Sequence, residues 1–76
     1  MILPNKHLKL SNSILNTGAV LLEVLNYEQT VTLLWDKVRI HPEIRTFDRF
    51  TLGLDLLFTI GLIDFNEAGL IGRTKQ

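Results

Sequence analysis

The residues of this chain that could take part in acid–base or metal chemistry are few and lie far apart in the sequence. It has two histidines, His7 and His41, and neither belongs to a His-Glu-x-x-His or a paired Asp-x-Asp motif that would hold a metal ion. His41 stands beside Pro42, as is typical of a surface turn, and His7 has lysines close by in the sequence. We therefore interpret both histidines as solvated side chains and expect no metal site.

Nucleophilic and phosphate-binding arrangements are equally hard to find. Ser11 and Ser13 belong to a Ser-Asn-Ser run that is typical of a helix start rather than of an activated nucleophile. Asp55 and Asp64 stand on opposite sides of Gly61, and nothing in the sequence indicates that they converge as an acid pair. The glycines are scattered singly, without the glycine-rich loop that cradles phosphate. We therefore predict no catalytic residue, no cofactor and no enzyme activity of this chain alone.

Length and composition favour a small domain that binds a partner. We expect the 76 residues to form one domain, over 1–76, and a chain of this size buries roughly 60–65% of its extended-chain surface. Yet 46% of the residues are hydrophobic, and the mean hydropathy is positive. The chain therefore has more apolar side chains than a small core readily buries, which is typical of a subunit that keeps a partner.

Charge, cysteine content and hydropathy exclude several classes of protein. Eight Lys and Arg residues balance eight Asp and Glu residues, so the positive excess that is usual in a free-standing nucleic-acid binder is missing. Cysteine is absent, which excludes disulfides and thiolate metal sites. The start, MILPNKHLKL, is too polar for a signal peptide, and the longest apolar segment, FTLGLDLLFTIGLIDF, is shorter than the ~20 residues that span a bilayer. We expect a cytoplasmic protein without membrane contact.

Two helices are predicted in the first half of the chain. After a short extended piece at Pro4, the Ser-Asn-Ser run predicts a helix start, and a helix over 14–25 that is apolar on most sides follows. Gly18 inside this helix indicates the close approach of another helix. Thr30 then caps a second helix over 31–40, in which Leu and Val residues recur at helical spacing.

A third helix and a hairpin complete the predicted fold. Pro42 interrupts the second helix, and Thr46 caps the third, over 47–60, which Gly61 ends. Two short strands, LIDF and LIGR, follow around an NEAG loop in which Gly69 can supply the positive φ of a hairpin. This order predicts a mostly α fold with a small β-hairpin, a three-helix, winged helix-turn-helix-like single domain. A plain three-helix bundle with a frayed tail is the alternative.

A winged helix often binds DNA through its third helix, yet here that helix carries almost no positive charge. In a helix-turn-helix, the N-terminal residues of the second helix of the pair contact base edges. The predicted helix has Arg49 as its only cation, while Asp48 and Asp55 would face phosphate unfavourably if exposed. If DNA is contacted, Arg49 is a candidate to reach the bases, and a modest basic edge consists of Lys37, Arg39, Arg45 and Arg73. We favour the interpretation that all these cations are ordinary solvated surface residues.

We expect the domain to bind protein rather than DNA, through apolar residues that the core does not need. Trp35 is expected to anchor the core between the second and third helices. Interfaces favour apolar and aromatic residues in a central patch with a polar rim. The candidates lie in the N-terminal lead-in, the first helix and the loop after it, and they are Leu3, Leu8, Leu10, Leu21, Leu22, Leu25 and Tyr27. The alternative is that the N-terminal leucines close the bottom of the core.

The chain also resembles a known family. The segments MILPNKHLKLSNSILNTGA, TVTLLWDKV and FDRFTLGLDLLFTIGLIDFNEAGLI, in this order, are similar to the small middle components of bacterial ABC-three-component systems. The most distinctive part is the first seven residues, and the Leu-Trp pair at 34–35 and the Phe-Asp-Arg-Phe opening of the third helix support it. The similarity covers nearly the whole chain.

The resemblance implies a system with a large ABC-type ATPase, related to chromosome-maintenance and DNA-repair ATPases, and an effector, which defends against phages or plasmids. It implies a non-enzymatic middle component that connects or regulates the other subunits, and it transfers no active-site residue. We therefore predict an adaptor subunit that acts by protein–protein contact. Weak contact with DNA and a homodimer stay open. The alternatives are a small winged-helix DNA-binding transcriptional regulator and an antitoxin-like neutraliser of the effector.

Overall fold

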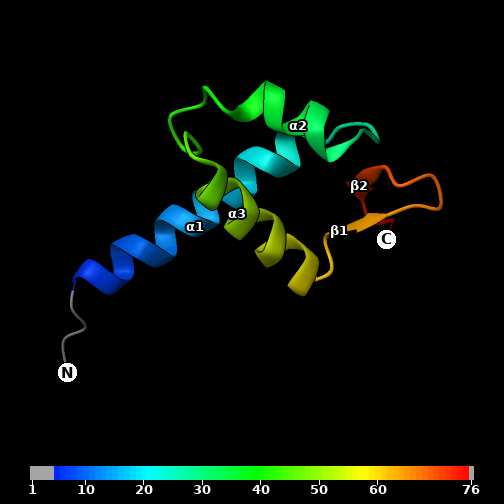
Figure 1. The fold of residues 1–76 in the computed structure, drawn as a ribbon. Coiled ribbons are helices and arrows are strands. Elements are labelled where there is room, and N and C mark those ends of the chain that lie inside the picture. The colour runs from blue at the N-terminus through cyan, green and yellow to red at the C-terminus, as the bar shows by residue number, and fades with distance from the viewer. Residues whose placement is uncertain (1–4, 76) are drawn as a thin grey trace.

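Three helices and a two-stranded hairpin make up the fold. The computed structural model describes the backbone of residues 5–75 and the side chains of residues 13–75 (Figure 1). It confirms the predicted mostly helical fold with a small hairpin, an order of elements that is consistent with a winged-helix-like domain. The elements follow in the order α1 (Asn5–Val24), α2 (Val31–Val38), α3 (Phe47–Thr59), β1 (Ile63–Phe65) and β2 (Ile71–Arg73).

Local sequence signals determine where α2 and α3 begin. The Oγ1 of Thr30 accepts a hydrogen bond of 3.0 Å from the N–H of Leu33, and the Oγ1 of Thr46 accepts one of 3.2 Å from the N–H of Arg49. Asp48 lies in the first turn of α3, where the positive end of the helix dipole stabilises a carboxylate. Both predicted N-caps are therefore confirmed.

The first two helices differ in length from the prediction. α1 begins at Asn5, so the Ser-Asn-Ser run at 11–13 lies inside the helix and does not start it. Ser and Asn cost only about 0.5 kcal/mol each inside a helix, and packing of the rest of α1 offsets this cost. α2 ends at Val38, two residues earlier than expected. The N–H of His41 then donates to the carbonyl oxygen of Val38 at 2.9 Å, which turns the chain before Pro42.

Helices α1 and α3 cross closely because each has a glycine at the contact. A Cβ at Gly53 would lie 2.7 Å from the Cγ2 of Thr17 and 2.8 Å from the Cδ1 of Leu21, too short for a carbon–carbon contact. A Cβ at Gly18 would lie 3.4 Å from the Cδ2 of Leu57, which confirms the helix approach predicted there. The buried core around this crossing consists of Leu21, Leu25, Leu34, Val38, Ile44, Phe50, Leu54, Leu57, Ile63 and Ile71.

The hairpin follows α3 directly and forms the wing. Gly61 ends the helix with a φ of 80°, and Gly69 has a φ of 83° in the loop between the strands, as predicted for both. The antiparallel register places Asp64 opposite Gly72 at the centre of the pair. The Oδ1 of Asn66 accepts hydrogen bonds of 2.8 and 3.0 Å from two amides of the loop, which fix its shape.

A single residue between α1 and α2 extends the small sheet. The N–H of Gln29 donates to the carbonyl oxygen of Ile71 at 3.0 Å, and the N–H of Ile71 donates back at 2.7 Å. Strand β2 therefore lies between β1 and Gln29. The extended piece predicted at Pro4 lies outside the described residues. Only a loop was predicted after the first helix, because one bridging residue produces no alternating pattern.

Candidate functional site

The solvent-facing side of α3 carries two acidic side chains with a leucine between them, followed by a threonine. Its members recur at three- and four-residue steps, so they share one stripe about 60° wide along the helix. All of them are exposed, and Leu52 keeps 50% of its surface in contact with solvent. We call this stripe the α3 ridge, and it consists of Asp48, Leu52, Asp55 and Thr59.

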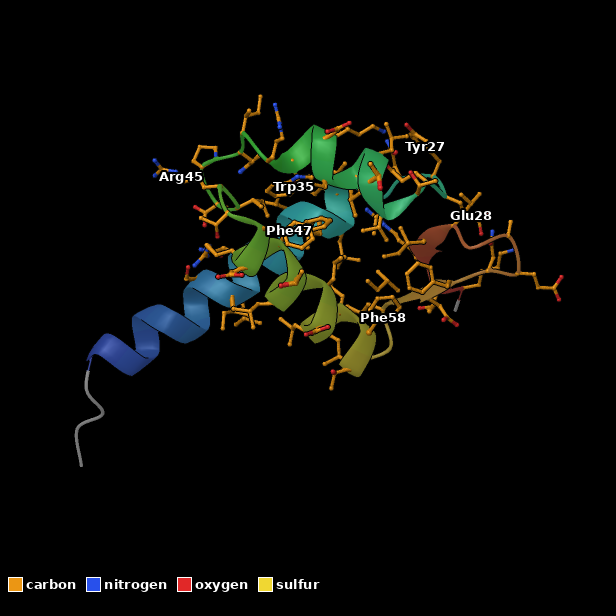
Figure 2. All side chains as sticks on the ribbon, viewed as in Figure 1. Tyr27, Glu28, Trp35, Arg45, Phe47 and Phe58 are labelled. Atoms are coloured by element: carbon orange, nitrogen blue, oxygen red, sulfur yellow. The ribbon has the colours of Figure 1, made fainter. Side chains whose placement is uncertain are left out.

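An aromatic cluster borders the α3 ridge at its N-terminal end. The ring of Phe47 lies 5.2 Å from that of Trp35, edge to face, and 5.6 Å from that of Phe50, measured between ring centroids. Trp35 also lies 5.2 Å from Phe50, so it links α2 to α3 and packs against the core, as predicted. Figure 2 shows Phe47 near Trp35. The side chain of Phe47 is 53% exposed. Packing therefore holds this ring in place while half of it faces solvent.

The only cation of α3 is directed away from the α3 ridge. The Nη2 of Arg49 donates to the carbonyl oxygen of Ser13 at 3.0 Å and to the Oγ1 of Thr17 at 2.8 Å. Its Nε donates to the carbonyl oxygen of Glu43 at 3.2 Å, and Nη2 also contacts the hydroxyl of Ser13. Thr17 is buried, with 1% of its surface exposed. The guanidinium therefore joins α1 and the α2–α3 loop to α3, and the ridge is left with negative charge.

Two further candidate DNA contacts also bind neighbouring groups of the fold. The Nε of Arg73 donates to the carbonyl oxygen of Leu22 at 2.9 Å and so ties the hairpin to α1. The Nζ of Lys37 donates to the hydroxyl of Tyr27 and lies 4.3 Å from the centroid of its ring. These contacts hold Arg73 against α1 and Lys37 against the loop after α1, and neither residue belongs to the α3 ridge.

The loop between α2 and α3 holds the remaining candidate cations. Arg45 has a φ of 64°, in the left-handed region that L residues adopt at a cost of roughly 1–2 kcal/mol. Directly before it, Ile44 is fully buried, and the N–H of Thr46 donates to the carbonyl oxygen of Ile44 at 2.7 Å. This turn lets Thr46 cap α3 while Ile44 fills the core. Arg45 and Arg39 are both exposed.

A comparison with known protein families identifies the chain. Over residues 3–74 it matches the family described as "ABC-three component (ABC-3C) system Middle Component 6". The chain belongs to this family. The resemblance stated from the sequence is thus confirmed, and membership implies that other components of the same system are its partners. Neither the curated proteins nor the solved structures contain a match to the chain.

Only part of the predicted partner-binding set of this middle component reaches the surface. Leu21 and Leu25 are 0% and 1% exposed, which corrects the prediction for these two residues. They belong to the side of α1 that the core buries. Leu22 is half-buried and packs against the core, and Tyr27 is 54% exposed. The other three candidates, Leu3, Leu8 and Leu10, are not among the residues whose side chains the structure describes.

The exposed apolar residues of α2 and α3 were not predicted as partner-binding residues. They include Phe47, Leu33 and Ile40, which are 53%, 42% and 83% exposed. Leu52 was not predicted either, although a residue two positions after the buried Phe50 lies on the opposite side of a helix. Helical spacing would therefore have found Leu52. The exposure of Phe47 depends on how its ring packs against those of Trp35 and Phe50, which helical spacing does not predict.

The described residues of the middle component show little that resembles a reaction centre. Across residues 13–75 there is no pocket and no group of three or more His, Asp or Glu side chains that could hold a metal ion. His41 accepts a hydrogen bond of 3.0 Å at Nδ1 from the N–H of Glu43, in the turn where it was predicted. No helix of the described part combines the length and the hydropathy that a membrane span requires.

Proposed function

We propose that this middle component is a non-enzymatic adaptor or regulatory subunit of a bacterial ABC-ATPase complex that defends the cell against phages or plasmids. It acts by protein–protein contact with the large ATPase subunit and with an effector subunit, in the cytoplasm, where invading DNA is met. Membership of the middle-component family supports a place in such a multi-component system. The observation that carries the proposal is the charge and hydropathy of the α3 ridge.

Electrostatics favours a protein partner over DNA at α3. Binding to DNA depends on cations that neutralise phosphates, and α3 has only Arg49, which donates to groups inside the fold. Asp48 and Asp55 are exposed on the same helix and would repel phosphates that approached it. A winged helix with this surface is therefore better suited to bind a protein than the major groove.

The number of exposed large apolar side chains supports the same conclusion. Such residues are common singly on protein surfaces, but partner interfaces gather aromatic and aliphatic side chains in their centres. In this small domain, between 42% and 83% of the surface of each of the following side chains is exposed: Leu15, Tyr27, Leu33, Ile40, Phe47, Leu52, Ile60 and Phe65. Binding of a partner over several of these side chains would be favoured, because it would bury apolar surface that the small core leaves in contact with solvent.

Co-expression with the ATPase subunit of the same system tests the proposal. We expect the two chains to elute together in size-exclusion chromatography at about 150 mM salt, where surface charges are screened beyond about 8 Å. Separate elution would contradict the proposal. Titration of the isolated chain with a short DNA duplex at the same salt tests the regulator alternative. Tight binding that is lost when Arg39 and Arg45, the exposed loop cations, become alanine would favour that alternative.

A further inference from the structure

The α3 ridge, together with Phe47, indicates the chemistry of the segment that covers it. We propose that this surface docks an amphipathic helix of the ATPase subunit that carries lysine or arginine on both sides of an apolar residue. This inference rests on the proposed function and adds to it the place of contact and the kind of partner segment.

The spacing of the two aspartates on the α3 ridge indicates where the partner must have positive charge. Asp48 and Asp55 are seven residues apart, so they lie about 10 Å from each other along the helix axis, with Leu52 between them. Leu52 is half exposed, and both aspartates are exposed. A facing helix that buries Leu52 must place its own side chains near both carboxylates. Cations there are attracted, whereas acids or unpaired polar groups would be costly.

The packing of Phe47 carries the second step. Its ring is held by Trp35 and Phe50, with centroid distances of 5.2 and 5.6 Å, and is 53% exposed. Because the ring is already held in place, covering its exposed half costs little side-chain entropy. Aromatic residues held in this way are frequent among the residues that contribute most to protein–protein affinity. Phe47 therefore supplies an apolar anchor at the N-terminal end of α3, at the edge of the side that carries the ridge.

The negative charge of the α3 ridge favours a basic protein segment over DNA or a membrane as the partner of this surface. DNA and the anionic face of a membrane both carry negative charge, and the same two carboxylates repel both of them. Arg49 does not offset this repulsion, because its donors bind Ser13, Thr17 and Glu43. A helix with lysine or arginine beside an apolar residue satisfies both the apolar and the acidic parts of the surface.

Substitutions on the ridge, with a matched control on α2, test the inference. Asp55→Lys reverses one ridge charge, and Asp36→Lys makes the same change at an exposed acid of α2. We expect Asp55→Lys to raise the Kd for the purified ATPase subunit about tenfold or more, and Asp36→Lys to change it less than about twofold. Leu52→Ala should also raise the Kd, about tenfold. Asp55→Asn should raise it less and should reduce its dependence on salt.

The outcomes of this experiment distinguish failure of the docking surface from failure of the proposed function. Thermal unfolding of every variant first establishes that it is folded, and the exposed Asp55 and Leu52 should tolerate these changes. If the wild-type chain binds the ATPase subunit and the ridge variants bind equally well, the docking surface is overturned while the proposed function stands. If the wild-type chain does not bind, both are overturned. If Asp55→Lys strengthens binding to a DNA duplex more than Asp36→Lys does, and leaves the Kd for the ATPase subunit unchanged, α3 faces nucleic acid and the docking surface is again overturned.

Discussion

The guanidinium of Arg49 donates a hydrogen bond of 2.8 Å to the hydroxyl of Thr17, at the place where α3 crosses α1. This bond takes the only cation of α3 away from the surface that a winged helix usually presents to DNA. It also holds together three parts of the chain, because Arg49 donates to Glu43 in the α2–α3 loop as well. One side chain thus contributes to the stability of the fold and determines the sign of the charge on the exposed side of α3.

Replacing Arg49 should therefore reduce stability. Arg49→Met keeps an unbranched apolar stem and removes the hydrogen bonds to Ser13, Thr17 and Glu43. We expect the free energy of unfolding to fall by about 2 kcal/mol in urea titrations, since bonds to charged groups contribute about 1.5–3 kcal/mol. Arg45→Met, at an exposed position, should change it by less than about 0.5 kcal/mol. Equal stability of Arg49→Met and wild type would contradict the role given to this residue.

The two glycines at the helix crossing should respond to alanine with opposite signs. At Gly53 a methyl group would lie 2.7 Å from the Thr17 Cγ2, so the buried Thr17 side chain or the helices must shift, at a cost of about 1–3 kcal/mol. At Gly18 the nearest atom is 3.4 Å away, an ordinary contact, and alanine gains about 1 kcal/mol of helix propensity. Chemical denaturation of Gly53→Ala and Gly18→Ala measures both effects. A stabilised Gly53→Ala would show that the crossing is looser than described.

Local signals predicted much of this fold, and tertiary contacts account for the rest. Thr30 and Thr46 were correctly predicted as N-caps. A threonine hydroxyl directly before an apolar run can accept a hydrogen bond from an N–H of the first helical turn, and this interaction does not depend on the rest of the fold. Gly18 predicted a helix contact, but the second glycine of the same crossing, Gly53 on α3, was not identified. The bridge of Gln29 to Ile71 joins residues far apart in the sequence, so no local pattern reveals it.

The candidate site was less predictable than the fold for a related reason. Balanced composition and the acids of the third helix predicted a surface unsuited to DNA, but not which apolar residues remain exposed. Leu21 and Leu22 are neighbours in an apolar run, yet only Leu21 is fully buried, because α3 covers one side of α1. Which side of α1 is covered depends on where α3 crosses it, at Gly53. The hydrophobic pattern of α1 does not predict the position of this crossing.

The left-handed backbone at Arg45 should be relieved by glycine. An L residue with a φ of 64° carries roughly 1–2 kcal/mol of steric cost, and glycine avoids it while losing more entropy on folding. We expect Arg45→Gly to raise the free energy of unfolding by up to about 1 kcal/mol, whereas Arg45→Ala should leave it nearly unchanged. A lower stability of Arg45→Gly than of Arg45→Ala, measured in the same denaturant, would argue against strain at this position.

Removal of the α3 cap should destabilise the start of the helix that carries the ridge. Thr46→Ala removes the acceptor for the N–H of Arg49, and we expect a loss of about 1 kcal/mol. Thr32→Ala, at an exposed position within α2, provides the control and should be neutral or slightly stabilising, because alanine has the higher helix propensity. Thermal unfolding of the two variants, with their enthalpies, compares them directly. Equal losses would indicate a general effect of removing threonine.

A photo-reactive amino acid at position 52 tests most directly whether α3 is a protein-docking helix. Position 52 lies between the two aspartates of the α3 ridge and is half exposed, so a probe there reaches whatever covers the ridge. Irradiation of the assembled complex with bound duplex should give an adduct with a lysine- or arginine-bearing segment of the ATPase subunit. The same probe at position 36 on α2 should give far less. Cross-linking from position 52 to the DNA, with none to protein, would contradict the account.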